Sequence, residues 1–147
     1  MNTNHPEILL GSLEGPHLIL RPLEMPQKNI DPEYCCPVEV TVTAGNFKGS
    51  SWVTIEVGLF QQLHQALYKF SVNPVGEFTF SSIAREFWAS VRGNNSGKFE
   101  AYCVLDDNEN KYTRLRFKVE FGKKELKQSM VAVGKLLSSL EITPSNL

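Results

Sequence analysis

The 147-residue sequence has no long apolar run, no excess of either charge and only three cysteines. A helix needs about 20 consecutive apolar residues to cross a bilayer, and no segment of the sequence provides them. The first residues, MNTNHPEILL, lack the basic and apolar regions of a secretory signal peptide, so we expect a cytoplasmic protein. The net charge of −1 creates no field that attracts nucleic acid or an anionic membrane, and we expect neither as a partner.

The cysteines lack the spacing of a metal site. The stretch EYCCPVEV places Cys35 and Cys36 side by side, whereas the ligands of a structural zinc ion are usually paired with roughly two to four residues between them. Cys103 alternates with inward-facing apolar residues of a predicted strand, where cysteine behaves as a small hydrophobic residue. We therefore expect unreactive thiols, no metal ion and no cofactor.

Two loops have the composition of ligand-binding motifs but not their spacing. In GNNSGKF, three residues instead of four separate the glycines, and Phe99 follows Lys98 where a phosphate-binding loop has serine or threonine. In DDNENKYTRLRF, Lys111 and Phe117 stand where a calcium loop has glycine and glutamate. Both loops are predicted to be turns, and the sequence contains no motif that identifies a catalytic residue.

Most of the chain alternates between apolar and polar residues, which is typical of half-buried antiparallel strands. The clearest example is VEVTVTAGNFKGSSWVTIEV, which predicts a hairpin around the glycine-rich turn. The same alternation recurs in segments 78–91, 99–105 and 115–121, and segment 8–25 contains two shorter extended stretches. Because short turns connect consecutive strands, the strands are expected to pair antiparallel.

Two segments change to the 3.6-residue period of an amphipathic helix, at about 58–71 and about 123–141. His64 lies off the apolar stripe of the first helix, so we expect it on a flank or on the surface. The sequence therefore predicts an α+β fold, with a single curved, mostly antiparallel sheet of about 6–8 strands and both helices packed on one face.

The chain length is that of one domain, and residues 1–147 are expected to form it. Segments 1–7 and 142–147 are predicted to be flexible. Segment 25–37 is rich in proline, which restricts both its own backbone and the preceding residue, and is predicted to be a loop.

Three aromatic residues point away from the apolar sides of their predicted strands. Trp52, Trp88 and Tyr102 would share the sheet face opposite the helices if their strands are neighbours. Exposed tryptophan and tyrosine are enriched at protein interfaces, so these residues are candidate anchors, with Glu56 and Glu86 as candidate charges at the rim. The alternative is that the N-terminal segment or the proline-rich loop covers the aromatic residues.

The order of motifs resembles that of the bacterial WapI-like immunity family and related small bacterial proteins. The resemblance rests on GNFKGSSWVTIEV, LFQQLHQALYKF, GEFTF, GKFEAYCVLDD and LRFKVEF, and it covers most of residues 8–141. It implies an α+β fold and, for members encoded beside toxin genes, neutralisation of a nuclease toxin by direct binding.

We therefore expect a non-enzymatic protein-binding domain, with toxin neutralisation by steric occlusion as the finer expectation. The alternative is a small-molecule-binding or enzymatic protein, with a pocket between the sheet and the helices that uses His64 and a cysteine. The sequence leaves the partner, the oligomeric state and the strand order open.

Overall fold

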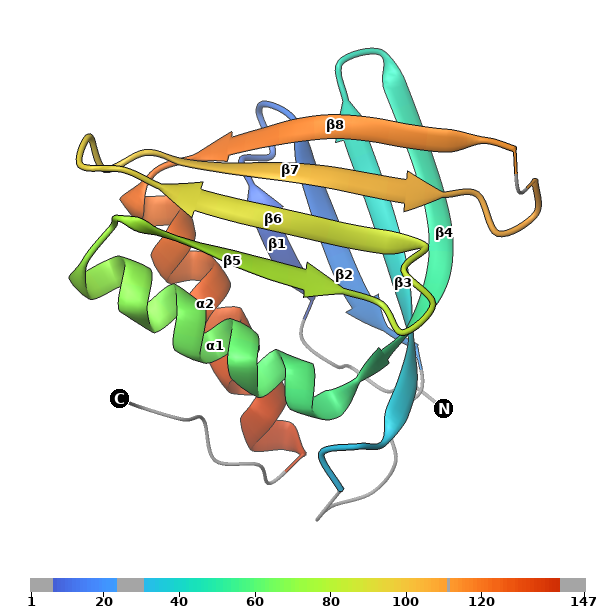
Figure 1. Cartoon of the computed structure of the whole chain (residues 1–147), viewed down its shortest axis with the longest axis horizontal. Coiled ribbons are helices and arrows are strands. Elements are labelled where there is room, and N and C mark those ends of the chain that lie inside the picture. Colours follow the sequence, from blue (N-terminus) through green and yellow to red (C-terminus); the bar gives the residue numbers. More distant parts are fainter. Residues whose placement is uncertain (1–6, 24–30, 111, 141–147) are drawn as a thin grey trace.

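The computed structural model describes residues 7–23, 31–110 and 112–140, and these residues form eight strands and two helices. Their order is four strands, a helix, four strands and a second helix (Figure 1). The segments predicted to be flexible, 1–7 and 142–147, lie outside the described residues except for Glu7.

The N-terminal sheet is an antiparallel meander in the order β1-β2-β3-β4. Its strands are β1 (Ile8–Gly11), β2 (His17–Pro22), β3 (Cys35–Ala44) and β4 (Phe47–Glu56). The predicted hairpin around GNFKG is confirmed as β3 and β4. Its tight turn places Gly45 at a φ of +62°, a backbone conformation that glycine adopts without the steric cost of a side chain.

The C-terminal sheet is a second antiparallel meander, in the order β5-β6-β7-β8. Its strands are β5 (Gly76–Ser81), β6 (Phe87–Gly93), β7 (Phe99–Asp106) and β8 (Arg114–Phe121). The phosphate-loop-like and calcium-loop-like segments connect β6 to β7 and β7 to β8, as the turn prediction requires.

The predicted α+β class is confirmed, but the strands form two sheets of four instead of one continuous sheet. The reason lies in α1 (Val57–Val72), which follows β4 directly and has 16 residues. At 1.5 Å per residue, such a helix carries the chain about 24 Å along its axis before β5 begins, so β5 cannot form a hairpin with β4. Figure 1 shows that the strands of the two sheets cross at a steep angle.

Both helices lie close to the predicted ranges. After α1, the Asn73-Pro74 sequence ends the helix because proline has no amide hydrogen to continue the hydrogen-bond ladder. The second helix, α2, spans Lys123–Ser139. At its start, the backbone N–H of Gly122 donates a hydrogen bond to Oε1 of Glu125 at 2.9 Å, which is a typical helix-start contact.

The two sheets and the two helices enclose one cluster of buried apolar side chains. Helix α2 joins this cluster beside β1, where the Ser129 hydroxyl donates a hydrogen bond to the backbone carbonyl of Leu9 at 2.5 Å. His64 lies on a flank of α1, as predicted, but its side chain is buried there and not exposed at the surface. Helix α2 packs on that flank of α1: a Cβ built on Gly134 lies 3.5 Å from Nε2 of His64.

The predicted proline-rich loop is shorter than expected at its C-terminal end. Residues 24–30 lie outside the described residues, whereas Cys35 and Pro37 already belong to β3. The backbone N–H of Leu23 donates to the carbonyl of Pro37 at 2.9 Å, and Cys35 is in register with Glu56. This pairing with both neighbouring strands outweighs the local tendency of proline to interrupt a strand. Within the described residues, neither helix has the length and apolar content needed to cross a membrane.

Candidate functional site

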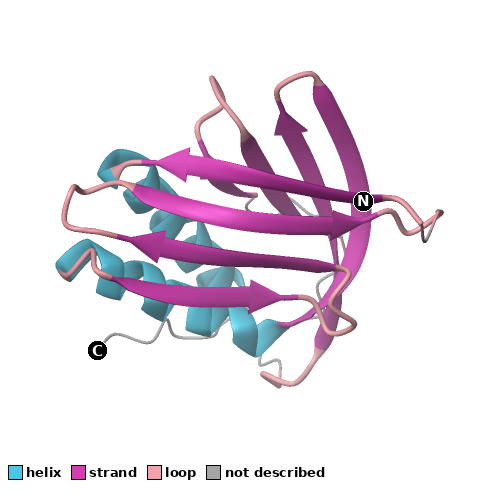
Figure 2. Cartoon of the chain, turned by 45° about the horizontal axis from the view of Figure 1, so that its top comes forward, coloured by secondary structure: helices cyan, strands magenta, loops and turns pink. Residues whose placement is uncertain are grey.

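The outer face of the C-terminal sheet is left open by the helices and strands that the structure describes. Figures 1 and 2 show this sheet in front, with both helices and the N-terminal sheet on its other side and no described helix or strand over its front. Burial alternates along β6: Phe87, Ala89 and Val91 face the core, while Trp88 and Ser90 face outward. The exposure of this face therefore follows from the arrangement of the whole fold.

Trp88 and Tyr102 lie together on this outer face. Trp88 is in register with Val104, and Ser90 is in register with Tyr102, so the two aromatic residues are diagonal neighbours on adjacent strands. Side chains in such positions are separated by about 7–8 Å between Cα atoms, within reach of large rings. Tyr102 is 44% exposed, whereas Val104 is only 4% exposed although it faces outward. The flanking side chains of Trp88 and Arg116 explain that burial, because both are in register with Val104.

Six neighbouring residues at outward positions of β6, β7 and β8 are called the outer-face cluster here: Trp88, Ser90, Tyr102, Val104, Arg116 and Lys118.

Ion pairs connect most of the charged groups on the outer face. Arg114 donates to Asp106 at 2.6 Å, and Arg92 lies 3.3 Å from Glu77. The Ser90 hydroxyl, and then Arg92, hold the pKa of Glu77 below its ordinary value by hydrogen bonding to its carboxylate. These exposed pairs order the surface and contribute little to folding stability.

Lys118 and Arg116 differ in their partners. The carboxylates of Glu120 and Glu100, at 3.6 Å and 3.5 Å, raise the pKa of Lys118, and its ammonium lies 6.0 Å from the centre of the Tyr102 ring. Arg116, in contrast, has no ion-pair partner among residues 7–23, 31–110 and 112–140. No carboxylate of the described residues therefore pairs with this guanidinium group, the donor that best fits a carboxylate.

Trp52 and Glu56 do not join this cluster. Trp52 is 54% exposed on the outer face of the N-terminal sheet, where it is in register with Glu39. The Glu39 carboxylate accepts hydrogen bonds from Arg21 and from the Ser50 hydroxyl. Glu56 is exposed at the end of β4, directly before α1. The expectation that all three aromatic residues share one face assumed a single sheet, and the division into two sheets separates Trp52 from the others.

Glu86 lies at the edge of the C-terminal sheet, in the connection between β5 and β6. Its Oε1 accepts a hydrogen bond from the Ser82 hydroxyl at 2.8 Å, and its backbone carbonyl accepts one from the amide of Asp106 at 2.8 Å. Glu86 is half-buried. These contacts give it a clear role in holding the connection in place, alongside its predicted role as a rim charge.

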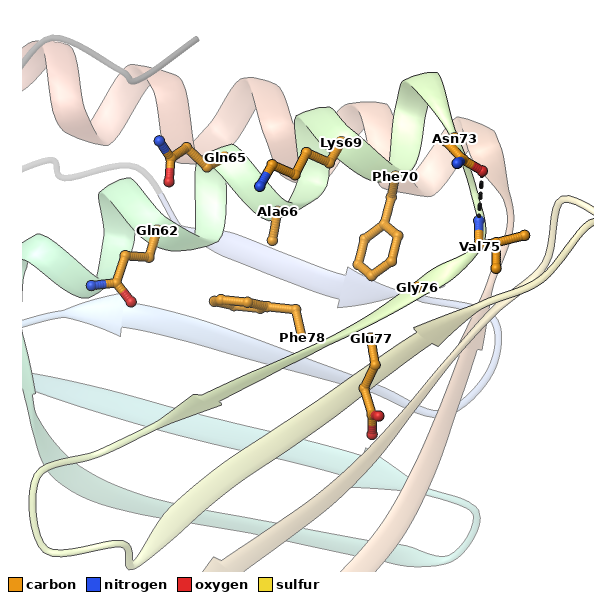
Figure 3. Close-up of a pocket in the computed structure, with 10 residues that line it drawn as sticks. All are labelled: Gln62, Gln65, Ala66, Lys69, Phe70, Asn73, Val75, Gly76, Glu77 and Phe78. Carbon is orange, nitrogen blue, oxygen red and sulfur yellow. Dashed lines mark hydrogen bonds between the residues drawn. The ribbon is translucent and has the colours of Figure 1, made fainter. Parts of the chain in front are cut away.

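A groove of about 540 Å³ separates α1 from β5 (Figure 3). Ala66, Phe70 and Phe78 provide its apolar surface, and polar side chains of α1 stand along the opposite rim. The groove matches the predicted location of a pocket between a sheet and a helix. Its lining contains neither a cysteine nor a histidine, so the geometry gives no support to the alternative in which His64 and a thiol act together there.

Two of the three thiols are buried. Cys36 and Cys103 belong to the buried cluster, and Cys35 is exposed. Burial raises the pKa of Cys36 to about 11, with a smaller contribution from the neighbouring Cys35, and burial alone raises the pKa of Cys103 to about 12. A raised pKa keeps both thiols neutral and poorly nucleophilic well above neutral pH. Within the described residues, no group of acidic, histidine and cysteine side chains is arranged to hold a metal ion.

Alkylation of the native protein tests this arrangement. Near neutral pH we expect iodoacetamide to modify one equivalent of thiol, at Cys35, and to modify all three cysteines after denaturation. Peptide mass spectrometry identifies the labelled residue. Rapid labelling of Cys36 or Cys103 in the folded protein would contradict the burial described above and would favour the enzymatic alternative.

Sequence reasoning missed the groove and four members of the outer-face cluster, namely Ser90, Val104, Arg116 and Lys118. Arg116 and Lys118 were recognisable as outward-facing charges, but not as neighbours of the aromatic residues. Val104 carried a usable signal, because an apolar residue in outward register on β7 interrupts the alternation of that strand. No such signal existed in the sequence for Phe78 and Lys69 of the groove, because only the packing of α1 beside β5 brings them together.

Comparisons with known proteins give information about the fold of this chain but not about its function. No family model matches the chain, and the search of curated proteins found no match. Among solved structures, the chain is similar to one in the crystal structures of Trypanosoma brucei MRP1/MRP2. The TM-score is 0.51 at 14% sequence identity, over 91% of this chain and 85% of that one. At this identity the likeness supports the arrangement of strands and helices and carries no information about a partner.

Proposed function

We propose that the chain is a non-enzymatic binding domain that engages another protein through the outer face of its C-terminal sheet. The observation that carries the proposal is the uncovered outer-face cluster, with Trp88 and Tyr102 as neighbours at its centre. Tryptophan, tyrosine and arginine dominate the binding energy of protein interfaces, because each removes a large surface from water while retaining a polar group. All three residue types occur within this cluster.

The charge of the outer face favours a protein partner over nucleic acid. The four cations on its strands, Arg92, Arg114, Arg116 and Lys118, are matched in number by four carboxylates, those of Glu77, Glu100, Asp106 and Glu120. A nucleic-acid surface needs an excess of lysine and arginine to replace the counterions of the phosphates. A balanced face with aromatic residues at its centre lacks that excess.

In finer terms, we propose that the partner is a toxin and that binding neutralises it by covering its active surface, in the cytoplasm. The resemblance to the WapI-like immunity family supports this choice. Trp88 and Tyr102 would enter apolar recesses of the toxin, and Arg116 would pair with one of its carboxylates. Occlusion of this kind requires a rigid surface and no catalytic group, which agrees with the hydrogen-bonded strands that carry the cluster.

Affinity capture with matched tryptophan variants tests the proposal. The wild-type chain, Trp88→Ala and Trp52→Ala serve as baits for the products of adjacent genes and for a lysate of the source cell. We expect Trp88→Ala to weaken the affinity for the captured partner by about 30-fold, the equivalent of about 2 kcal/mol at an interface anchor. Trp52→Ala, which removes a more exposed indole from the other sheet, should leave the affinity within about two-fold.

Two results would contradict the proposal. If Trp52→Ala abolishes capture and Trp88→Ala does not, the partner binds the N-terminal sheet. If Trp88→Ala lowers the melting temperature in parallel with the affinity, Trp88 is a structural residue and not an anchor. The toxin assignment has its own readout, since cells that express the captured partner should survive with the wild-type chain and die with Trp88→Ala.

A further inference from the structure

Strand β5 is one of the two edge strands of the C-terminal sheet, and alternate backbone groups of this strand point away from the sheet. The N–H of Ser82 donates to the carbonyl of Phe87 at 2.8 Å, which directs the backbone groups of Ser82 toward β6. The direction alternates along an antiparallel strand, so the N–H and C=O groups of Glu77, Thr79 and Ser81 point toward the open side. These groups have no hydrogen-bond partner among the described residues.

Two other edges of the sheets are at least partly closed. The β1 edge lies beside α2, whose Ser129 hydroxyl caps the carbonyl of Leu9. On the β4 edge, the carbonyl of Thr54 accepts a hydrogen bond from the N–H of Ile83 at 2.9 Å. Exposed strand edges attract further strands, and proteins usually cover them. Of these three edges, the open segment of β5 is therefore the exception to this rule.

The β5 edge faces the groove along α1, and this groove has the shape and chemistry to hold an extended peptide. Phe78, Phe70 and Ala66 form an apolar floor beside the first residues of β5, Gly76–Phe78 (Figure 3). A strand that pairs with β5 would lie about 4.8 Å from it and would direct every second side chain onto this floor. The groove thus combines backbone hydrogen bonds with an apolar recess for alternate side chains, the two requirements of strand addition.

The charge along the groove selects for a carboxylate in the bound segment. Lys69 stands on the α1 rim and has no ion-pair partner among residues 7–23, 31–110 and 112–140. Figure 3 shows Glu77 pointing away from α1, where Ser90 and Arg92 hold its carboxylate. Gln62 and Gln65 provide uncharged amides along the same rim. Among the described residues that line the groove, the one charge directed at it is therefore positive.

We propose that the β5 edge and the groove bind an extended segment of the protein partner, which adds a fifth strand to the C-terminal sheet. The segment would place an apolar side chain on Phe78 and a carboxylate near Lys69. This inference rests on the proposed function and deepens it. The Thr79 side chain is in register with Ser90, which pairs with Tyr102, so the added strand would continue the outer-face cluster into one larger interface.

A single strand fits this site better than a second copy of the chain. Helix α1 stands alongside the open edge of β5 (Figure 1), and both elements line the groove. A second copy that paired its own β5 with this edge would have to bring its adjoining helix into the same space. A segment that is one strand wide avoids that conflict.

Selection from a library of random-sequence decapeptides tests the proposal while the identity of the partner is still open. Peptides selected on the wild-type chain are measured by fluorescence polarisation against Thr79→Pro and Thr79→Val. Proline removes the outward N–H of Thr79 and is tolerated at strand edges, whereas valine keeps the N–H and the branched shape. We expect Thr79→Pro to weaken binding by about ten-fold or more, and Thr79→Val to leave it within about two-fold.

Three further arms complete the test. In a selected peptide, N-methylation of the amides that face β5 should abolish binding, and N-methylation of the alternate amides should leave binding unchanged. This arm tests the proposal even if Thr79→Pro fails to fold. Lys69→Glu should reduce the affinity of peptides that contain aspartate or glutamate. Trp88→Ala should still bind the peptides, which separates failure of the groove from failure of the outer face.

Failure to select any peptide, or equal binding by Thr79→Pro, overturns the proposal. A wild-type dimer in sedimentation analysis that Thr79→Pro dissociates also overturns it, because the edge would then belong to a second copy.

Discussion

Phe99→Ala is expected to lower the free energy of unfolding by about 3–5 kcal/mol, the usual range for removal of a buried aromatic ring. Phe99 is fully buried, and its ring centre lies 5.5 Å from those of Phe70 and Phe121. The cavity would remove one of the ring contacts that join α1 to the C-terminal sheet, that between Phe70 and Phe99. Because domains of this size are stable by only about 5–15 kcal/mol, a large part of the total would be lost. Denaturant titration followed by circular dichroism measures the change.

The matched control for Phe99→Ala is Phe47→Ala. Phe47 is 69% exposed at the start of β4, so its replacement should change the free energy of unfolding by less than about 0.5 kcal/mol. Similar losses in the two variants would mean that Phe99 is not part of the core. Phe99→Ala should also disturb the groove, because the contact between Phe70 and Phe99 anchors the end of α1 that lines it.

Gly93→Ala is expected to destabilise the protein by about 3 kcal/mol, near the upper end for overpacking of a tight site. A Cβ at this position would lie 1.9 Å from the carbonyl oxygen of Pro74 and 2.7 Å from Cε1 of Phe99. The carbonyl belongs to the backbone, so it moves only if the connection between α1 and β5 moves. The same titration, or a thermal melt, measures the effect.

Gly49→Ala provides the control, because a Cβ built on Gly49 meets nothing within 4 Å. This substitution adds one methyl group to a strand and should be nearly neutral, within about 0.5 kcal/mol. If Gly93→Ala were equally neutral, α1 and β5 could separate easily at this end, and the groove would not have the fixed shape that strand addition requires.

The sequence predicts most of the local structure correctly because the periodicity of apolar residues is a local property. Alternation in VEVTVTAGNFKGSSWVTIEV reveals β3 and β4, and the 3.6-residue period reveals α1 and α2 nearly to their ends. The outward direction of Trp88 and Tyr102 follows from the same alternation. The burial of Cys103 follows as well, since it shares the inward side with Phe99 and Ala101.

Periodicity does not show which strands pair or which elements pack against each other, and the errors of the prediction arise from those long-range contacts. A single sheet and two sheets of four have the same alternation, so the sequence could not show that α1 interrupts the pairing between β4 and β5. The placement of Trp52 beside Trp88 failed for that reason. The burial of His64 was not predicted because it depends on α2, a helix about 60 residues further along the chain.

The sequence by itself thus determined the class of the fold, the ranges of its helices and hairpins, and the outward direction of the aromatic residues. All of these follow from interactions between residues close together in the chain. Only the tertiary structure decided that Trp88, Tyr102 and Arg116 form one uncovered cluster, and that the open edge of β5 faces an apolar groove on α1. Those features depend on long-range packing around the shared core, where the burial of both sheets and both helices settles which surfaces remain exposed to solvent.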